Sequence, residues 1–222
     1  MSTVEGGGNI VNNGLILCLD SANTKSYNGV SNTWYDLSKS LNNNGTLING
    51  VTFSNINGGI MIFDGVNDYI QFQSIASLSS TSYTISSWFK PISTTTGFAT
   101  LMGYSGTRRL LWDSNNKSMT AQMGGSGVGS TANSVLANQW CYVTFIYDMS
   151  LSKEYWYING VYNAINDNFS STFNSTFYLG YYGNPSFYWL NGNISMVHIY
   201  NRRLSDSEIE QNYNAIKKRY EL

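Results

Sequence analysis

Aromatic residues in turn-like segments are the side chains of this sequence best suited to hold a ligand. Sugars bind where apolar C–H faces stack on aromatic rings and neutral amides meet hydroxyl groups. The clearest such segment is Tyr181-Tyr182-Gly183-Asn184-Pro185. The candidate contacts are Trp34, Tyr104, Trp112, Tyr181, Tyr182, Tyr188 and Trp189. Two alternatives stay open, because tyrosine and tryptophan are also common in protein cores and at subunit interfaces.

Acidic side chains in one polar loop form a candidate calcium site. Asp20 and Asp36 are the candidate ligands, and Asn42 and Asn43 lie in the same segment. Hard cations such as Ca²⁺ require several oxygen ligands, which these side chains supply. Asp64 and Asp68 are explained equally well by turn formation. The sequence otherwise indicates no cofactor, so calcium is the one that it leaves open.

The residues needed for catalysis are sparse. His198 is the only histidine and lies within an apolar strand-like run, where a hydrogen-bonded core residue is the usual interpretation. Asp206 and Glu208 are close, but their position predicts a role in the first turn of a helix. The glycine-rich run 124–129 lacks the Lys-Ser/Thr ending of a phosphate-binding loop. We therefore expect a protein that is not an enzyme, with a glycosidase using an unrecognised acid pair as the weakest alternative.

The charge content argues against nucleic-acid and membrane partners. Only 11 % of the 222 residues are charged and the net charge is -1, with lysine and arginine scattered along the chain. Nucleic-acid binding and adhesion to acidic membranes need a concentrated basic surface. No apolar run approaches the roughly 18 residues of a membrane span.

The N-terminal segment carries no sign of a secretory signal, since it has neither a basic region nor an apolar stretch. We therefore expect synthesis in a host cytoplasm, with release by lysis or as part of a particle. Cys18 and Cys141 each lie in an apolar run, and we predict two buried free thiols rather than a disulfide.

The elements that must position these residues are mostly strands. Short runs with alternating or apolar character recur between Gly, Asn and Ser clusters, and Asn159-Gly160 is typical of a type I′ hairpin turn. In the run 193–200 both faces are largely apolar, which predicts a strand inside a sandwich. Ser205 and Glu208 have the spacing of a capping box, Leu204 and Ile209 that of a hydrophobic staple, and together they predict a helix over 205–219.

The chain divides into an arm and one domain. Residues 1–13 contain a Gly triplet and little to bury, which predicts a flexible N-terminal arm. The alternative is a tether that orders against a neighbouring subunit. Residues 14–222, including the helix at 205–219, are predicted to form one all-β domain, an antiparallel β-sandwich with one short C-terminal helix.

The final strand and helix start resemble the closing signature of laminin-G-like, concanavalin-A-like jelly-roll modules. The resemblance rests on the segment 192–209 and on three earlier segments in the same order, namely 63–70, 140–148 and 157–160. Within this family, the opening 14–38 and the ending 200–205 are most similar to small modules of tailed-bacteriophage virion proteins. Many modules of the family hold calcium, although Ser195 stands near a position where the family often has an acid.

The resemblance implies a structural or decorating protein of a phage head, neck or fibre that also contacts host glycans. Its partners would be other virion proteins or further copies of itself in a homo-oligomer, and its location the virion. The alternative is a free carbohydrate-binding module or lectin. The same fold carries many functions, so the fold alone does not decide between these classes.

Overall fold

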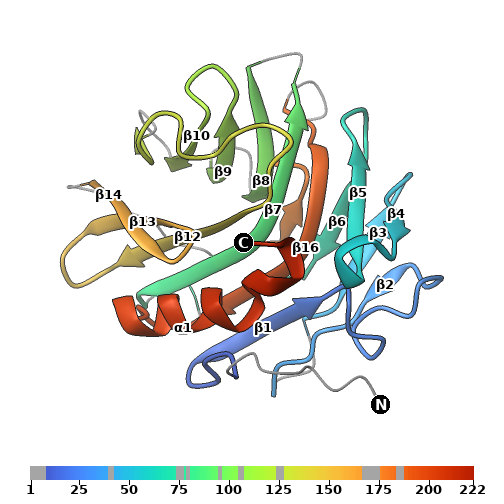
Figure 1. Cartoon of the computed structure of the whole chain (residues 1–222), viewed down its shortest axis with the longest axis horizontal. Coiled ribbons are helices and arrows are strands. Elements are labelled where there is room, and N and C mark those ends of the chain that lie inside the picture. Colours follow the sequence, from blue (N-terminus) through green and yellow to red (C-terminus); the bar gives the residue numbers. More distant parts are fainter. Residues whose placement is uncertain are drawn as a thin grey trace.

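A computed structural model of the chain describes residues 9–39, 43–73, 78, 81–94, 97–104, 108–123, 128–166, 176–183 and 188–222. Within these residues the strands form two antiparallel sheets of eight strands each, stacked as a sandwich (Figure 1). This is the predicted all-β jelly-roll architecture. None of the helices in this part of the chain has the length and hydropathy needed to span a bilayer.

Sheet A contains the longest strands and has the order β14-β13-β12-β7-β16-β5-β4, with β1 paired to β16. Its strands are β1 (Leu15–Asp20), β4 (Thr52–Ser54), β5 (Ile60–Asp64), β7 (Tyr83–Ser93), β12 (Cys141–Asp148), β13 (Lys153–Ile158), β14 (Val161–Asn166) and β16 (Asn191–Tyr200). The turn between β13 and β14 has φ of 52° at Asn159 and 80° at Gly160, which confirms the predicted hairpin.

Sheet B has the order β11-β10-β9-β8-β15-β6-β3-β2. Its strands are β2 (Thr33–Trp34), β3 (Gly45–Ile48), β6 (Tyr69–Phe72), β8 (Phe98–Tyr104), β9 (Arg108–Asp113), β10 (Ser118–Met123), β11 (Val128–Gly129) and β15 (Phe177–Leu179). A 3₁₀ turn, η1 (Ile56–Gly58), links β4 and β5. Sheet B matters most for function because its outer face carries the candidate site.

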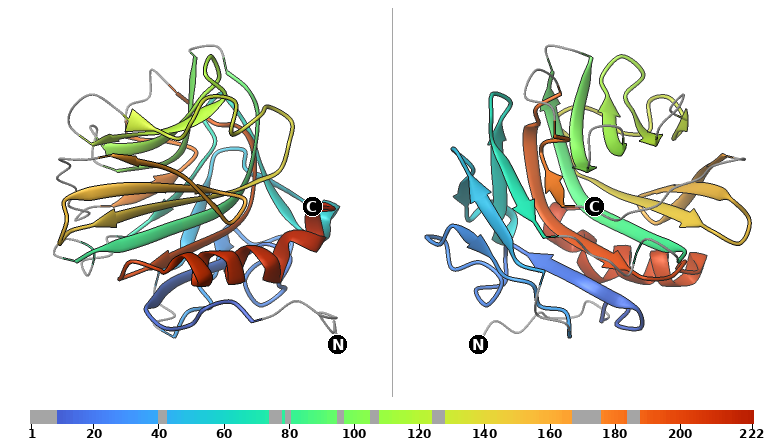
Figure 2. Two further views of the ribbon diagram at one scale, coloured as in Figure 1. Left: turned by 60° about the vertical axis from the view of Figure 1, so that its left-hand side comes forward. Right: turned by 180° about the vertical axis from the view of Figure 1, so that it is seen from behind.

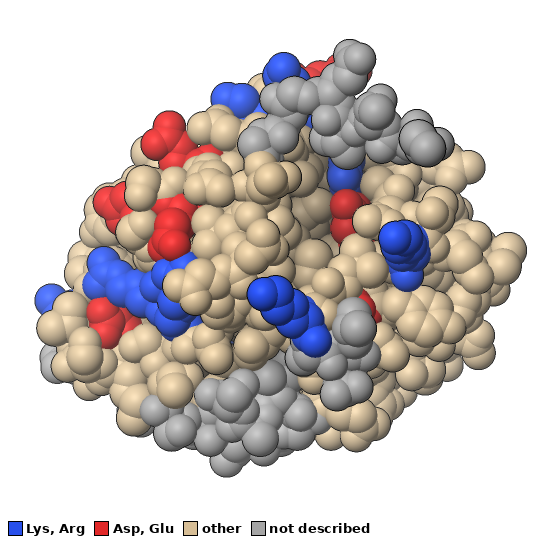
Figure 3. All heavy atoms as spheres, turned by 90° about the horizontal axis from the view of Figure 1, so that it is seen from below, with Lys and Arg blue, Asp and Glu red and all other residues tan. Residues whose placement is uncertain are grey.

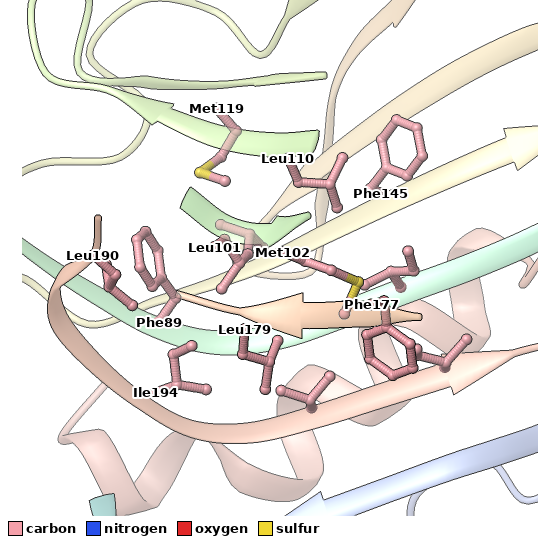
Figure 4. Close-up of a cluster of buried hydrophobic side chains, with 14 of the residues drawn as sticks. Phe89, Leu101, Met102, Leu110, Met119, Phe145, Phe177, Leu179, Leu190 and Ile194 are labelled. Atoms are coloured by element: carbon pink, nitrogen blue, oxygen red, sulfur yellow. The ribbon is translucent and has the colours of Figure 1, made fainter. Parts of the chain in front are cut away.

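The hydrophobic core fills the space between the sheets. Alternate residues of a strand point to opposite faces, so each strand contributes every second side chain to this layer. Figure 4 shows side chains from both sheets meeting there, among them Phe89 and Ile194 of sheet A and Leu110 and Phe177 of sheet B. Cys141 is buried in the same core and Cys18 lies outside it; both are free thiols, as predicted.

The closing strand β16 lies in the middle of sheet A. It pairs along its length with β7, and its two halves pair on the other side with β5 and with β1. Both faces of the strand are buried, since Ile194 and Val197 enter the core while Met196 and Tyr200 lie on the opposite side. The prediction of an internal strand is therefore confirmed.

The C-terminal helix α1 (Asp206–Ile216) continues into a 3₁₀ turn, η3 (Lys217–Tyr220), and covers the outer face of sheet A (Figure 2). Ser205 and Glu208 form the predicted capping box, and Leu204 and Ile209 are both buried in one apolar cluster. Tyr220 stacks on Trp88 of β7, with ring centroids 4.1 Å apart. Trp88 thus faces the helix rather than the space between the sheets.

Residues 9–13, which the sequence analysis placed in the arm, lie against this helix. The backbone N–H of Val11 donates to Oδ1 of Asn212, and the hydroxyl of Tyr200 donates to the carbonyl of Val11. Val11 is buried as a result. These buried polar partners hold residues 9–13 on the domain, while residues 1–8 lie outside the described residues.

Candidate functional site

The outer face of sheet B carries a row of polar and aromatic side chains. Ile70, Phe72, Phe177 and Leu179 enter the core, so the residues between them point outward. The register aligns five outward positions on five neighbouring strands. They are Gln71, Tyr178, Gly103, Arg109 and Gln122.

Four half-buried rings form an aromatic platform on this face, defined here as Tyr69, Tyr178, Tyr181 and Trp189. The rings of Tyr181 and Trp189 are stacked, with centroids 4.5 Å apart and planes 11° apart. Tyr69 and Tyr178 each lie with their ring centroids 5.1 Å from that of Tyr181. Two strands and the segment that follows β15 therefore converge on one aromatic surface.

Gly103 allows that segment to lie directly on the sheet. A Cβ at this position would come within 2.4 Å of Cα of Tyr182, closer than packed atoms approach. The segment is fixed further by backbone hydrogen bonds, from Thr100 N–H to the carbonyl of Tyr188 and from Leu190 N–H to the carbonyl of Gly180. Gly103 is therefore a positioning residue for the platform.

Arg109 stands at one side of the platform. Its guanidinium carbon lies 4.3 Å from the ring centroid of Tyr182 and 5.0 Å from that of Tyr188, within the range of cation–π contacts. Its Nε donates to Oε1 of Gln122 at 2.7 Å. The surface thus combines ring faces, tyrosine hydroxyls, an amide and a cation.

The hydroxyl of Tyr181 stays protonated at neutral pH. Burial raises the pKa of Tyr181 above its ordinary value, and the neighbouring hydroxyls of Tyr178, Tyr69 and Tyr182 raise it further. A neutral phenol both donates and accepts hydrogen bonds. The platform therefore offers neutral hydrogen-bonding groups beside its ring faces.

The structure brings together four of the predicted contact residues and separates two others. Tyr181, Tyr182, Tyr188 and Trp189 form or adjoin the platform, although Tyr182 is only 3 % exposed and presents its ring to Arg109. Trp34 and Trp112 are 0 % and 2 % exposed and belong to the core, because the strand alternation turns them inward. Neither is available to a ligand at the surface. The side chain of Tyr104, together with Asn184 and Pro185, lies outside the described residues.

Four residues of this surface were not among the predicted contacts, namely Tyr69, Tyr178, Arg109 and Gln122. Each lies at an outward position of a predicted strand, and the period-two pattern was the available signal. The pattern gives a face for each strand separately, whereas the site depends on which strands are neighbours. That pairing places β15 between β6 and β8.

The carboxylates of the two candidate calcium ligands accept hydrogen bonds from other groups of the protein. Both carboxylate oxygens of Asp20 accept from Arg219, at 2.8 and 3.1 Å. Asp36 accepts from the backbone N–H of Cys18 and from the N–H and hydroxyl of Ser38. Among the described residues, no group of three or more His, Cys, Asp or Glu side chains is arranged to hold a metal ion.

His198 lies under the helix on the opposite sheet from the platform. Its ring is buried, and neither nitrogen has a hydrogen-bond partner among the residues that the structure describes. Burial lowers the pKa of His198 to about 4, so the ring is neutral at physiological pH. The run 124–127 of the glycine-rich loop lies outside the described residues.

Comparison with known proteins gives a family match and several similar structures. The model of the concanavalin A-like lectin/glucanases superfamily matches residues 64–210. No curated protein sequence matches this chain.

Solved structures of similar fold come from larger chains. A Trypanosoma rangeli sialidase in complex with 2,3-difluoro-KDN is 18 % identical with a TM-score of 0.69, over 93 % of this chain and 33 % of the sialidase. The binding domain of botulinum neurotoxin serotype D is 16 % identical with a TM-score of 0.70, over 91 % of this chain and 52 % of that one. The binding domain of Paraclostridial Mosquitocidal Protein 1 is 18 % identical with the same TM-score and the same two coverages. The chain thus spans one third to one half of these proteins, and at such identities the likeness shows the fold.

Proposed function

The chain belongs to the concanavalin A-like lectin/glucanases superfamily, and on this premise we propose that it binds carbohydrate on the outer face of sheet B. The aromatic platform is the binding surface, with the stacked Tyr181–Trp189 pair at its centre. A pyranose ring packs its apolar C–H face on such rings, and its hydroxyls bond to tyrosine hydroxyls and amides at the edge.

The stacked Tyr181–Trp189 pair is the observation that carries this proposal. Large aromatic side chains are usually buried in the core, as Trp34, Trp112 and Trp156 are here. The platform rings instead remain partly exposed on a sheet face and pack on one another. A pre-assembled set of rings binds a ligand without the entropy cost of ordering each side chain.

The structures of similar fold support the same class of ligand. One is a Trypanosoma rangeli sialidase in complex with sialic acid, and two others are the binding domains of botulinum neurotoxin serotype D and of Paraclostridial Mosquitocidal Protein 1. The chain covers only part of each protein, so the proposal for this chain rests on its own platform.

We propose further that the protein acts by binding and not by catalysis. The two acids in the first turn of α1 already have protein partners. Asp206 accepts a hydrogen bond from the hydroxyl of Tyr157, while Glu208 pairs with Arg202 and belongs to the capping box. They lie on the side of sheet A, away from the platform. Absence of sugar release from a broad polysaccharide panel is the expected result, and turnover that one Asp→Asn change abolishes would overturn this part.

The role in a bacteriophage particle is a separate proposal that rests on the resemblance of the opening and closing segments. A head, neck or fibre protein would co-purify with particles and self-associate. Mass spectrometry of purified virions and light scattering of the protein test it. Absence from particles together with a monomer in solution would refute this role while leaving carbohydrate binding intact.

A glycan array followed by calorimetry tests the binding function. We expect specific glycan binding by the full chain and a loss of at least about tenfold in affinity for Trp189→Ala, because truncation removes one ring of the stacked pair. Tyr162→Ala is the matched control, since Tyr162 is an exposed aromatic residue on β14 of sheet A. No binding across the array, or equal loss in both variants, would contradict the proposal.

A further inference from the structure

Resting on the proposed function, we infer that the preferred ligand is an anionic glycan whose sugar carboxylate binds to the guanidinium of Arg109.

Arg109 differs from the other arginines whose side chains the structure describes. Arg202 pairs with Glu208 at 2.6 Å, Arg203 with Asp148 at 2.8 Å, and Arg219 with Asp20 at 2.8 Å. Arg109 has no carboxylate partner among the described residues. A cation held on a partly buried surface without a counter-charge favours binding of an anion.

The contacts of Arg109 fix its guanidinium and leave its outer edge available. Gln122 accepts from Nε, and the rings of Tyr182 and Tyr188 flank the group. Within the described part of the chain, neither Nη atom donates to a protein acceptor. A planar guanidinium held in this way presents two parallel N–H donors, which match the two oxygens of a carboxylate.

Arg109 lies close enough to the platform for its guanidinium to meet the carboxylate of a sugar that is bound there. Tyr182, which lies under Arg109, has its ring centroid 6.3 Å from that of Tyr181, the central ring of the platform. A sugar stacked on Tyr181 therefore has its substituents next to Arg109. The net charge of -1 makes general attraction of polyanions weak, so recognition must come from this local cation.

Paired ligands that differ only in charge test the inference. The probes are sialyllactose and an oligogalacturonate, each compared by calorimetry with its carboxyl methyl ester. We expect the wild-type chain to bind at least one acid about tenfold or more tightly than its ester. Arg109→Gln should remove this difference while binding of the ester stays within about twofold, and Arg109→Lys should keep part of it because the charge remains.

Arg203→Gln is the matched control, because Arg203 also lies over a tyrosine ring, at 4.2 Å from the centroid of Tyr155, but is paired with Asp148. The control should retain the full preference for the acid. Thermal melting of each variant shows whether it is folded, and Arg109→Lys keeps the test decisive where Arg109→Gln is unstable.

Three results would overturn the inference. Equal affinity for acid and ester, with both lost in Trp189→Ala, refutes the role of Arg109 and leaves carbohydrate binding standing. Persistence of the preference in Arg109→Gln refutes it as well. No binding to any glycan overturns both the inference and the proposed function.

Discussion

Arg219 donates from Nη1 and Nη2 to the two carboxylate oxygens of Asp20, and the pair joins the last turn of the chain to its first strand. Both side chains are largely buried, at 20 % and 17 % exposure. The carboxylate that the sequence offered as a calcium ligand is thus neutralised by a cation from the opposite terminus.

Calcium should have no effect on stability through Asp20, because Arg219 occupies both oxygens. We expect the melting temperature to be the same with EDTA and with added Ca²⁺. Arg219→Gln should lower the free energy of unfolding by about 1–3 kcal/mol, since it leaves a largely buried carboxylate without its partner. A clear rise in melting temperature on adding Ca²⁺ would show that the ion competes successfully with Arg219.

Gly103→Ala should weaken carbohydrate binding more than it weakens the fold. The added methyl group would collide with the backbone of Tyr182 and displace the segment that carries Tyr181. We expect an affinity loss of about tenfold or more, measured by calorimetry, with an unchanged circular dichroism spectrum. Thr100→Ala on the same strand is the control, because its buried hydroxyl bonds to no described residue and its N–H is retained.

Glu154 should make the protein less stable as the pH rises. Its carboxyl is buried, and burial raises the pKa of Glu154 to about 8 against an opposing effect of Asn166. The folded state therefore holds a proton that the unfolded state has released, and stability falls between about pH 4.5 and pH 8. In urea unfolding, Glu154→Gln should flatten this slope, whereas the exposed Glu210→Gln should not. An unchanged slope in Glu154→Gln would refute the assignment.

His198 should make the protein less stable as the pH falls, which is opposite to the effect of Glu154. Because its pKa is lowered to about 4 by burial, the unfolded state binds a proton below about pH 6.5 that the folded state does not. Its contribution to stability is complete above that pH and is lost as the pH falls toward 4. His198→Gln should shift the midpoint of acid unfolding to lower pH. Tryptophan fluorescence measures this midpoint. Identical acid transitions in both proteins would exclude His198 as the cause.

Local sequence patterns were sufficient for the long strands and the helix. The apolar run 142–147 predicts a strand that the structure extends by one residue at each end, and the Ser205–Glu208 spacing predicts the helix start. The short strands β2, β3 and β4 were not predicted, because they lie in polar segments. Their formation depends on pairing with strands elsewhere in the chain.

The candidate site could be predicted only in part, for a related reason. Tyr181 and Trp189 are adjacent in the sequence to turn residues, which made them visible as surface aromatics. Trp112 had the same appearance, yet its strand turns it inward, where its indole N–H donates to the carbonyl of Val135. Arg109 and the segment of Tyr181 meet only because β15 lies beside β8, and no local pattern records the pairing of strands so far apart in the sequence.

Apart from Arg109, the distribution of charged residues on the described surface does not indicate a binding site. The face of the molecule seen from below is mostly uncharged, with Lys, Arg, Asp and Glu scattered across it (Figure 3). Among the arginines whose side chains the structure describes, Arg202, Arg203 and Arg219 pair with carboxylates, and Arg109 on the outer face of sheet B does not.

The central place of β16 also determines when the domain can be completed during synthesis. The strand that bridges β7, β5 and β1 is the last strand to leave the ribosome. Until it emerges, β1 has no partner in sheet A, and the edges of β5 and β7 that face β16 stay unpaired. Folding of sheet A therefore depends on long-range pairing with β16, and a nascent chain exposes open strand edges until β16 has been made.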